Sequence, residues 1–187
     1  PLLDSLLAQT RQPDEFIICD AGSRDATKEI ISNFIADGLP ARIVVEEGAN
    51  RAQGRNLAIH QTTGEIIASI DAGCAAEPDW LARLVAPFES DHPPDVVAGY
   101  YEPDARSSLE DAIAAATVPD ASEVDAETFL PSGRSVAFTR RAWERVGGYP
   151  EHLHYAEDTA FNLRLRAAGC RFLFQPQARV RWRCLLY

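Results

Sequence analysis

Apolar residues follow two alternating patterns along the chain, and the alternation predicts its architecture. Short apolar runs rich in β-branched residues predict buried strands at residues 16–19, 43–45 and 66–70. Apolar residues at helical spacing predict helices at residues 2–7, from an N-cap at Ser23 to Gly38, at 53–63 with Gly64 as the C-cap, and at 79–85 after Pro78. This order is typical of an α/β fold with a mostly parallel central sheet flanked by helices.

The second half of the chain contains the same kinds of element in a less regular order. Strands are expected at residues 96–100, 135–138, 172–174 and 180–182, and helices at 109–117, around Trp143, and from Glu157 to Gly169. Residues 119–131 are acidic and show no periodicity, which predicts a long surface loop. No linker-like composition separates two parts, so residues 1–187 are interpreted as a single domain.

Composition and charge narrow the class of protein. The net charge of −10 argues against a general nucleic-acid binder, because phosphate backbones require clustered Lys and Arg. No apolar stretch approaches the roughly 20 residues that span a bilayer. The four cysteines lack CxxC spacing, so no zinc site is expected, and Cys19 and Cys170 are interpreted as buried free thiols. The first residues lack a basic leader, so no secretory signal is expected. Because the chain has no methionine and starts at Pro1 in a helical context, we expect a piece of a longer protein.

The tripeptide Asp-Ala-Gly closes two of the predicted strands, at residues 20–22 and 71–73. Open α/β sheets bind their ligands at the carboxyl ends of parallel strands. The Asp20 carboxylate can accept a hydrogen bond from a nucleotide base, or it can satisfy the N–H groups of a turn. Asp71 can bind Mg²⁺ or Mn²⁺ together with substrate phosphates, or it is again a turn residue. Gly73 adds no side chain to such a metal site.

Two further polar segments are candidates for binding and catalysis. Residues 50–56 are expected to form a basic loop ahead of a helix, in which Arg51 and Arg55 suit a diphosphate or a base; solvated surface arginines are the alternative. Glu157 and Asp158 stand at a predicted helix start. A carboxylate there can act as a general base toward a hydroxyl, or it can simply oppose the helix macrodipole.

Taken in order, these segments resemble the inverting glycosyltransferases of family 2, which have the GT-A nucleotide-sugar fold. The matching residues cover nearly the whole chain and are 5–10 with 13–15, 19–23 with Asp25, 54–56 with 64–67, 71–73 with 78–81, 147–149, and 157–166 with 168–169. Three features depart from the family pattern. The strand that normally precedes the first helix is missing, Gly73 replaces an acid, and Trp182 stands where many relatives have a metal-binding histidine.

The resemblance implies a role for each candidate residue. The nucleotide contacts would be Asp20, Ala21, Ser23, Arg51 and Arg55. Asp71 matches the first acid of the family's DxD motif, which binds a divalent metal (Mg or Mn) and the diphosphate. Asp158 matches the acid of the ED motif, the general base, with Glu157 beside it.

The function implied is an inverting transfer of a sugar from a nucleoside-diphosphate sugar to a hydroxyl acceptor. The acceptor would be a saccharide, a lipid or a polysaccharide, such as a cell-envelope polysaccharide. The resemblance implies no nucleic-acid partner, and it places the full-length protein in the cytoplasm or at the inner face of the membrane. Two alternatives stay open: a non-catalytic nucleotide-sugar binding module, which Gly73 and Trp182 motivate, and a nucleotidyltransferase on a related sheet.

Overall fold

The computed structural model describes residues 1–183, with Thr117 described by its backbone alone. The chain forms two compact units, each built from segments that are distant in sequence. Unit 1 contains Pro1–Gln12, Ala68–Phe138 and the chain from Cys170 onward, and unit 2 contains Pro13–Ile67 and Thr139–Gly169.

Unit 1 is organised around a five-stranded sheet with the strand order β3-β6-β5-β7-β4. The strands are β3 (Ile66–Ser69), β4 (Cys74–Ala76), β5 (Val96–Pro103), β6 (Val136–Thr139) and β7 (Phe172–Trp182). β5 and β7 run parallel, whereas β6 is antiparallel to β5 and β4 is antiparallel to β7. The sheet is therefore mixed, where the sequence predicts a mostly parallel one.

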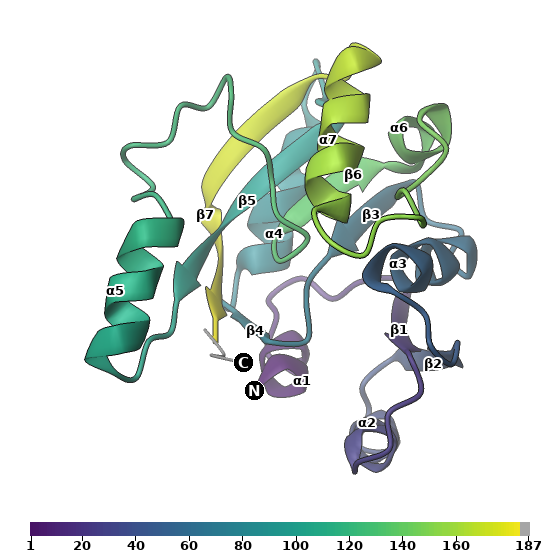
Figure 1. Ribbon diagram of the computed structural model, residues 1–187. Coiled ribbons are helices and arrows are strands. Elements are labelled where there is room, and N and C mark those ends of the chain that lie inside the picture. The colour runs from purple at the N-terminus through teal and green to yellow at the C-terminus, as the bar shows by residue number, and fades with distance from the viewer. Residues whose placement is uncertain (184–187) are drawn as a thin grey trace. The chain divides into compact units, whose positions relative to one another are not determined.

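Helices cover this sheet because their apolar residues need a buried partner. The helices of unit 1 are α1 (Leu2–Leu7), α4 (Trp80–Val85) with the short 3₁₀ helix η1 (Ala86–Glu89), and α5 (Ser108–Thr117). α4 packs against β5 and β7, and α1 contacts β4 (Figure 1). The side chains of Leu84, Val96, Val97 and Val180 are fully buried and form part of this core.

Unit 2 contains a two-stranded parallel ladder, β1 (Phe16–Asp20) with β2 (Ala41–Val45). Its helices are α2 (Thr27–Ala36), α3 (Arg51–His60), α6 (Arg140–Arg145) and α7 (Glu157–Ala167). α3 lies close to β1, since a Cβ placed on Gly54 would be 3.3 Å from the sulfur of Cys19. α7 contacts both α3 and α6.

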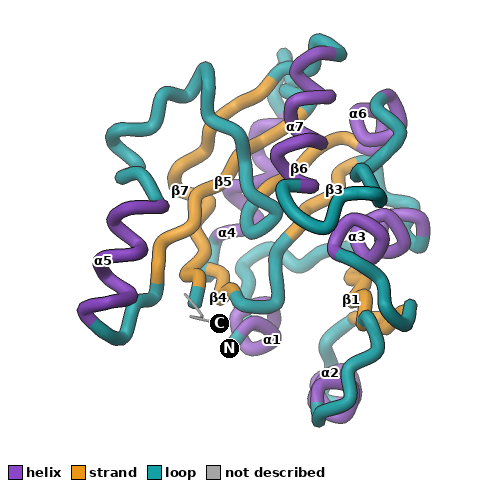
Figure 2. Tube along the Cα trace, viewed as in Figure 1, coloured by secondary structure: helices purple, strands orange, loops and turns teal. Residues whose placement is uncertain are grey.

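Most predicted elements are present; several differ at their ends, and β4 and η1 are elements that the sequence did not predict. Residues 118–135 contain no helix or strand and appear in Figure 2 as a long loop, as predicted for the acidic segment. Ser23 does not cap α2, whose N-cap is Ala26, and Gly64 does not cap α3, which ends at His60. The two predicted C-terminal strands are one continuous strand, β7, because β5 extends to Pro103 and pairs with both halves.

The predicted free thiols at Cys19 and Cys170 are confirmed, but only Cys170 is buried, because Cys19 is half-buried. Cys74 is a further buried free thiol, and Cys184 lies outside the described residues. Desolvation raises the pKa of the Cys19 thiol, and it raises the pKa of Cys74 to about 12. Both thiols are therefore protonated at neutral pH. Among residues 1–183, no helix has the length and the apolar character that crossing a membrane requires.

Candidate active site

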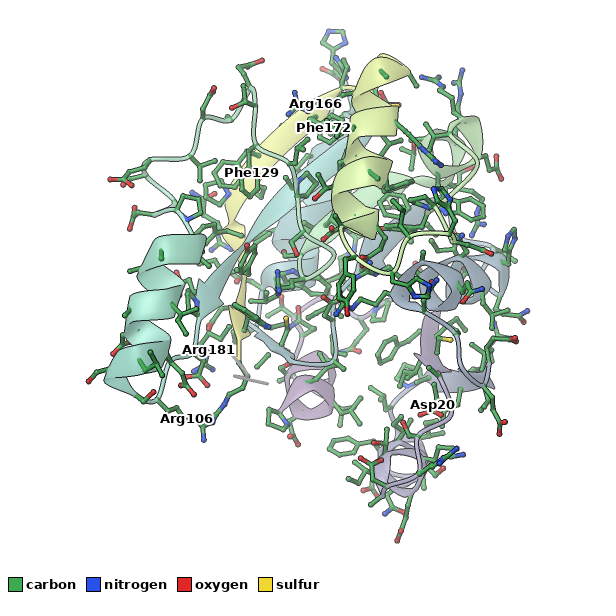
Figure 3. The ribbon with its side chains drawn as sticks, in the orientation of Figure 1. Asp20, Arg106, Phe129, Arg166, Phe172 and Arg181 are labelled. Carbon is green, nitrogen blue, oxygen red and sulfur yellow. The ribbon has the colours of Figure 1, made fainter. Side chains whose placement is uncertain are left out.

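Asp20 is the last residue of β1 (Figure 3). It is almost completely buried, with 4 % of its surface exposed. Its Oδ1 accepts hydrogen bonds from the backbone N–H groups of Gly22, at 2.9 Å, and Ser23, at 2.8 Å. Gly22 has a φ of +96°, a conformation that favours glycine. Hydrogen bonds from the Ser23 side chain and from these backbone groups lower the pKa of Asp20. The turn interpretation thus holds for one carboxylate oxygen, and the carboxylate stays ionised.

A shallow pocket opens directly after Asp20 in unit 2. It is lined by Ala21, Gly22, Ser23, Arg24, Lys28, Glu47 and Gly48. Two of the lining residues, Arg24 and Lys28, are cations that the sequence analysis did not single out. In the sequence, only their positions indicate a role: Arg24 lies in the turn after Asp20 and Lys28 in the first turn of α2. Backbone polar groups and two cations suit a polar, anionic ligand.

Arg51 and Arg55 lie within α3 and not in a loop ahead of it. The helix begins one residue after Asn50, whose side chain forms a capping box with Gln53. Arg55 is 14 % exposed, and its Nη1 donates to Glu157 Oε1 at 2.7 Å. Arg51 is 64 % exposed and lies 4.0 Å from the other carboxylate oxygen of Glu157. The structure therefore brings Arg51, Arg55 and Glu157 together at the start of α7.

Asn56 is buried, with 5 % of its surface exposed, and it makes four hydrogen bonds within unit 2. Its amide nitrogen donates to the Tyr149 carbonyl at 2.9 Å and to Glu151 Oε1 at 2.8 Å. Its Oδ1 accepts from the Tyr149 N–H at 2.9 Å and from Trp143 Nε1 at 3.2 Å. The matched segments 54–56 and 147–149 are therefore partners in the fold, since these bonds satisfy every polar atom of the amide.

Asp158 follows the buried Glu157 in the first turn of α7 and is half-buried. Its Oδ1 accepts a hydrogen bond from the Thr159 N–H at 2.8 Å. The residue before the helix, Ala156, has a φ of +55°, which is strained for a side chain other than glycine. Strain of this kind clusters at functional sites, and here it immediately precedes the two carboxylates.

Asp71 belongs to unit 1 and lies in the turn between β3 and β4. Its carbonyl accepts the N–H of Cys74 at 3.0 Å, which closes the turn. A Cβ on Gly73 would lie 3.8 Å from two atoms of the Trp182 indole. Cys74 and Trp182 are directly paired between β4 and β7. Trp182 thus lies against the position where the family pattern has a second acid.

The residues around Asp71 do not fit a metal site built by the protein. Gly73 provides no side-chain ligand and its carbonyl accepts the Arg183 N–H, and the side chain beside it is an indole, which offers no lone pair to Mg²⁺ or Mn²⁺. Residues 1–183 contain no group of three His, Cys, Asp or Glu side chains that could hold a metal ion. Asp71 would be the single carboxylate ligand at this turn.

The predicted site residues divide between the two units. Seven of them belong to unit 2: Asp20, Ala21, Ser23, Arg51, Arg55, Glu157 and Asp158. Asp71 belongs to unit 1.

The sequence of the chain is similar to those of known glycosyltransferases. A relative in Haloferax volcanii, "Glycosyltransferase AglE", is 30% identical over 92% of this chain and 58% of its own length. The "O-antigen chain rhamnosyltransferase RfbN" of Salmonella typhimurium is 24% identical over 96% of this chain and 60% of its own. The chain thus spans about 60% of the length of these relatives.

Solved structures agree on the fold. TarS of S. aureus in complex with UDP-GlcNAc matches all of this chain and 54% of its own, with a TM-score of 0.78 and 19% identity. The mannosyltransferase PcManGT of Pyrobaculum calidifontis, in complex with GDP-Man and Mn2+, matches 96% of this chain and 51% of its own, with a TM-score of 0.75 and 22% identity. These neighbours show the GT-A glycosyltransferase fold. The model of the family described as "Glycosyl transferase family 2" matches residues 1–116, so the chain belongs to glycosyl transferase family 2.

Proposed function

We propose that this chain is the catalytic domain of an inverting glycosyltransferase that uses a nucleoside-diphosphate sugar as donor. The observation that supports it most directly is the first turn of α7. There, the buried Glu157 is bonded to Arg55 at 2.7 Å, and its neighbour Asp158 is half-buried. A carboxylate at a fixed position, with the adjacent carboxylate neutralised by an arginine, suits a general base.

In this proposal the two carboxylates have different roles. Asp158 takes the proton of the acceptor hydroxyl while the hydroxyl oxygen bonds to the anomeric carbon. The bond between that carbon and the diphosphate oxygen breaks, and its electron pair leaves with the nucleoside diphosphate. Glu157 is a positioning residue, because its carboxylate is only 3 % exposed and is held by Arg55.

Donor contacts are assigned within each unit separately: in unit 2 to the pocket after Asp20, and in unit 1 to the turn that contains Asp71. Asp20 has a second carboxylate oxygen in addition to the one bonded to the turn, and we assign it to the nucleoside, with Ala21 and Ser23 lining the same pocket. Arg51, which is largely exposed, remains a candidate nucleotide contact, whereas Arg55 is engaged with Glu157. We assign Asp71 to the diphosphate of the donor. The relatives and neighbours named above support a nucleotide-sugar donor in general.

The acceptor and the location are proposed at a coarser level. The acceptor that we propose is a hydroxyl of a saccharide or of a lipid-linked acceptor; the name of the O-antigen chain rhamnosyltransferase supports the saccharide class. We infer that the full-length protein acts in the cytoplasm or at the inner face of a membrane, where nucleotide sugars are made.

Asp158→Asn in the full-length protein is the decisive variant. The amide keeps the size of the side chain but cannot accept a proton, so transfer should fall at least 100-fold. Binding of UDP or GDP should change less than twofold. Asp111→Asn, at an exposed carboxylate in the first turn of α5, is the matched control and should leave transfer unchanged. Unchanged transfer in Asp158→Asn would overturn the role of Asp158.

Product stereochemistry tests the inverting step separately. A single displacement reverses the configuration at the anomeric carbon, which ¹H NMR of the initial product reads directly. Retained configuration would overturn the mechanism without affecting the family assignment. A wild-type full-length protein that binds nucleotide sugars and transfers none, over a panel of acceptors, would favour the binding module.

A further inference from the structure

Unit 1 holds an arginine between two aromatic rings. The guanidinium carbon of Arg134 lies 4.0 Å from the centroid of the Trp182 ring and 4.8 Å from that of Tyr101. The two rings are perpendicular to one another, with an interplanar angle of 87°. We call these three residues the arginine cage. Stacking on aromatic faces leaves the edge of a guanidinium, with its N–H groups, for hydrogen bonding.

The polar contacts of Arg134 do not account for its charge. Its Nη1 donates to the neutral hydroxyl of Ser132 at 3.0 Å. Its Nε is buried and has no hydrogen-bond partner among residues 1–183. Within the same residues no carboxylate forms an ion pair with Arg134. Burying an N–H group without a hydrogen-bond partner costs free energy, and half-burying a cation without an anion costs more. A bound anionic ligand would remove both costs.

The arginine cage lies next to the 71–74 turn. Trp182 contacts Gly73 within this unit, and the N–H of Arg183 donates to the Gly73 carbonyl at 3.0 Å. The Arg134 guanidinium stacks on this same indole, at 4.0 Å from the ring centroid, so the arginine cage borders the turn.

We propose that Arg134 is the cation that binds the donor's diphosphate at the 71–74 turn. This inference rests on the proposed function. A guanidinium offers two parallel N–H groups to phosphate oxygens, and it keeps its charge at every physiological pH. When the anomeric carbon–oxygen bond breaks, the electron pair stays on the diphosphate, and Arg134 stabilises that charge.

Gly73 and Trp182 depart from the family pattern at this turn, and both departures are consistent with Arg134 as the diphosphate-binding cation. The second acid of the motif would add negative charge beside the diphosphate, and its replacement by Gly73 removes that charge. The indole of Trp182, in place of a ligand atom, stacks on the guanidinium and fixes it. The arginine cage thus takes over the electrostatic role for which the residues around Asp71 are too few.

The test measures binding of UDP and of GDP to the full-length protein by calorimetry, in EDTA and in Mn²⁺. Arg134→Met keeps most of the side-chain volume and removes the charge, and Arg134→Lys keeps the charge without the fork. Arg179→Met is the matched control, because Arg179 lies in unit 1 on β7 and forms an exposed ion pair with Glu102. Uridine and guanosine, which lack phosphate, serve as control ligands.

We expect the wild-type protein to bind one of the two diphosphates in EDTA. Arg134→Met should weaken that binding at least tenfold, and Arg134→Lys should have an intermediate effect. The parent nucleoside should bind all variants equally, and Arg179→Met should stay within twofold of wild type.

Three results would overturn the proposal. One is a folded Arg134→Met variant that binds the diphosphate as tightly as wild type. If such a variant has a lower melting temperature but an unchanged affinity, the arginine cage is only structural. Another is wild-type binding that requires Mn²⁺. In both cases, sugar transfer by the wild-type protein would leave the proposed function intact. Wild-type protein that binds neither diphosphate under any condition would remove both the inference and the proposed function.

Discussion

Arg55 donates to the buried carboxylate of Glu157 at 2.7 Å, across 102 positions of sequence. The bond joins the middle of α3 to the first residue of α7, within unit 2. Both residues belong to segments that the sequence associates with ligand chemistry. In the structure they neutralise one another, and the position of Asp158 depends on them.

Arg55→Met should lower the free energy of unfolding by about 3 kcal/mol, because the buried Glu157 carboxylate loses its 2.7 Å partner and keeps the exposed Arg51 at 4.0 Å. Urea denaturation of the variant and of wild type gives this difference. Arg11→Met is the matched control: Arg11 pairs with Glu89 at the same distance of 2.7 Å, but these side chains are 47% and 64% exposed. The control should cost about 0.5 kcal/mol or less. Equal losses in the two variants would contradict the importance of burial.

Asn56→Ala should destabilise the protein by about 3 kcal/mol, since it leaves several buried partners without hydrogen bonds, among them Trp143 Nε1 and the Tyr149 backbone. Asn33→Ala, at an exposed position of α2, should change stability by less than about 0.5 kcal/mol. Thermal and urea unfolding measure both. If Asn56→Ala proved as mild as Asn33→Ala, the amide would not join residues 54–56 to residues 147–149.

Asp20 should give the protein a pH-dependent stability at the acid end. Its pKa is lowered in the folded state, first by the Ser23 side chain and then by backbone N–H groups. The unfolded chain therefore binds more protons in the window between the lowered pKa and the ordinary aspartate value of about 3.9. The stabilisation is complete above this window and is lost as the pH falls through the folded pKa.

Unfolding free energies of wild type and Asp20→Asn, measured from pH 7 down to pH 2, test this expectation. The difference in stability between them should be constant at neutral pH and should shrink through the acid window. A difference that is independent of pH over the whole range would show that the charge of Asp20 contributes nothing to stability.

Gly99→Ala should destabilise unit 1 by about 3 kcal/mol, because overpacking forces the neighbouring chain to move. A Cβ at Gly99 would overlap with Ser135 Oγ and would lie 2.7 Å from the Ala178 carbonyl. The same hydroxyl accepts from Trp80 Nε1 at 2.9 Å, so the strain would reach α4. Gly64→Ala is the control, since its nearest neighbour is the Ile66 carbonyl at 3.7 Å, and it should be neutral or slightly stabilising. Similar melting temperatures for the two variants would contradict this packing.

Local pattern was enough to predict most of the elements. The apolar run at 96–100 and the helical spacing at 2–7 depend on neighbours in sequence, and both elements form where predicted. The errors occur where a distant partner decides the outcome. β7 is one strand because β5 pairs along both of its halves, and β4 forms because its three residues pair with the end of β7. Neither partner can be identified from spacing alone.

The sequence by itself determined the family, the order of the elements and the identity of the candidate acids, because motif residues keep their order along the chain whatever the fold does. Only the tertiary structure decided what each side chain faces. It joined Arg55 to Glu157 and Asn56 to Tyr149, and it put Arg134 against Trp182. The physical reason is that hydrogen bonding, desolvation and cation–π contact act over a few ångströms in space. Sequence separation carries no information about such distances.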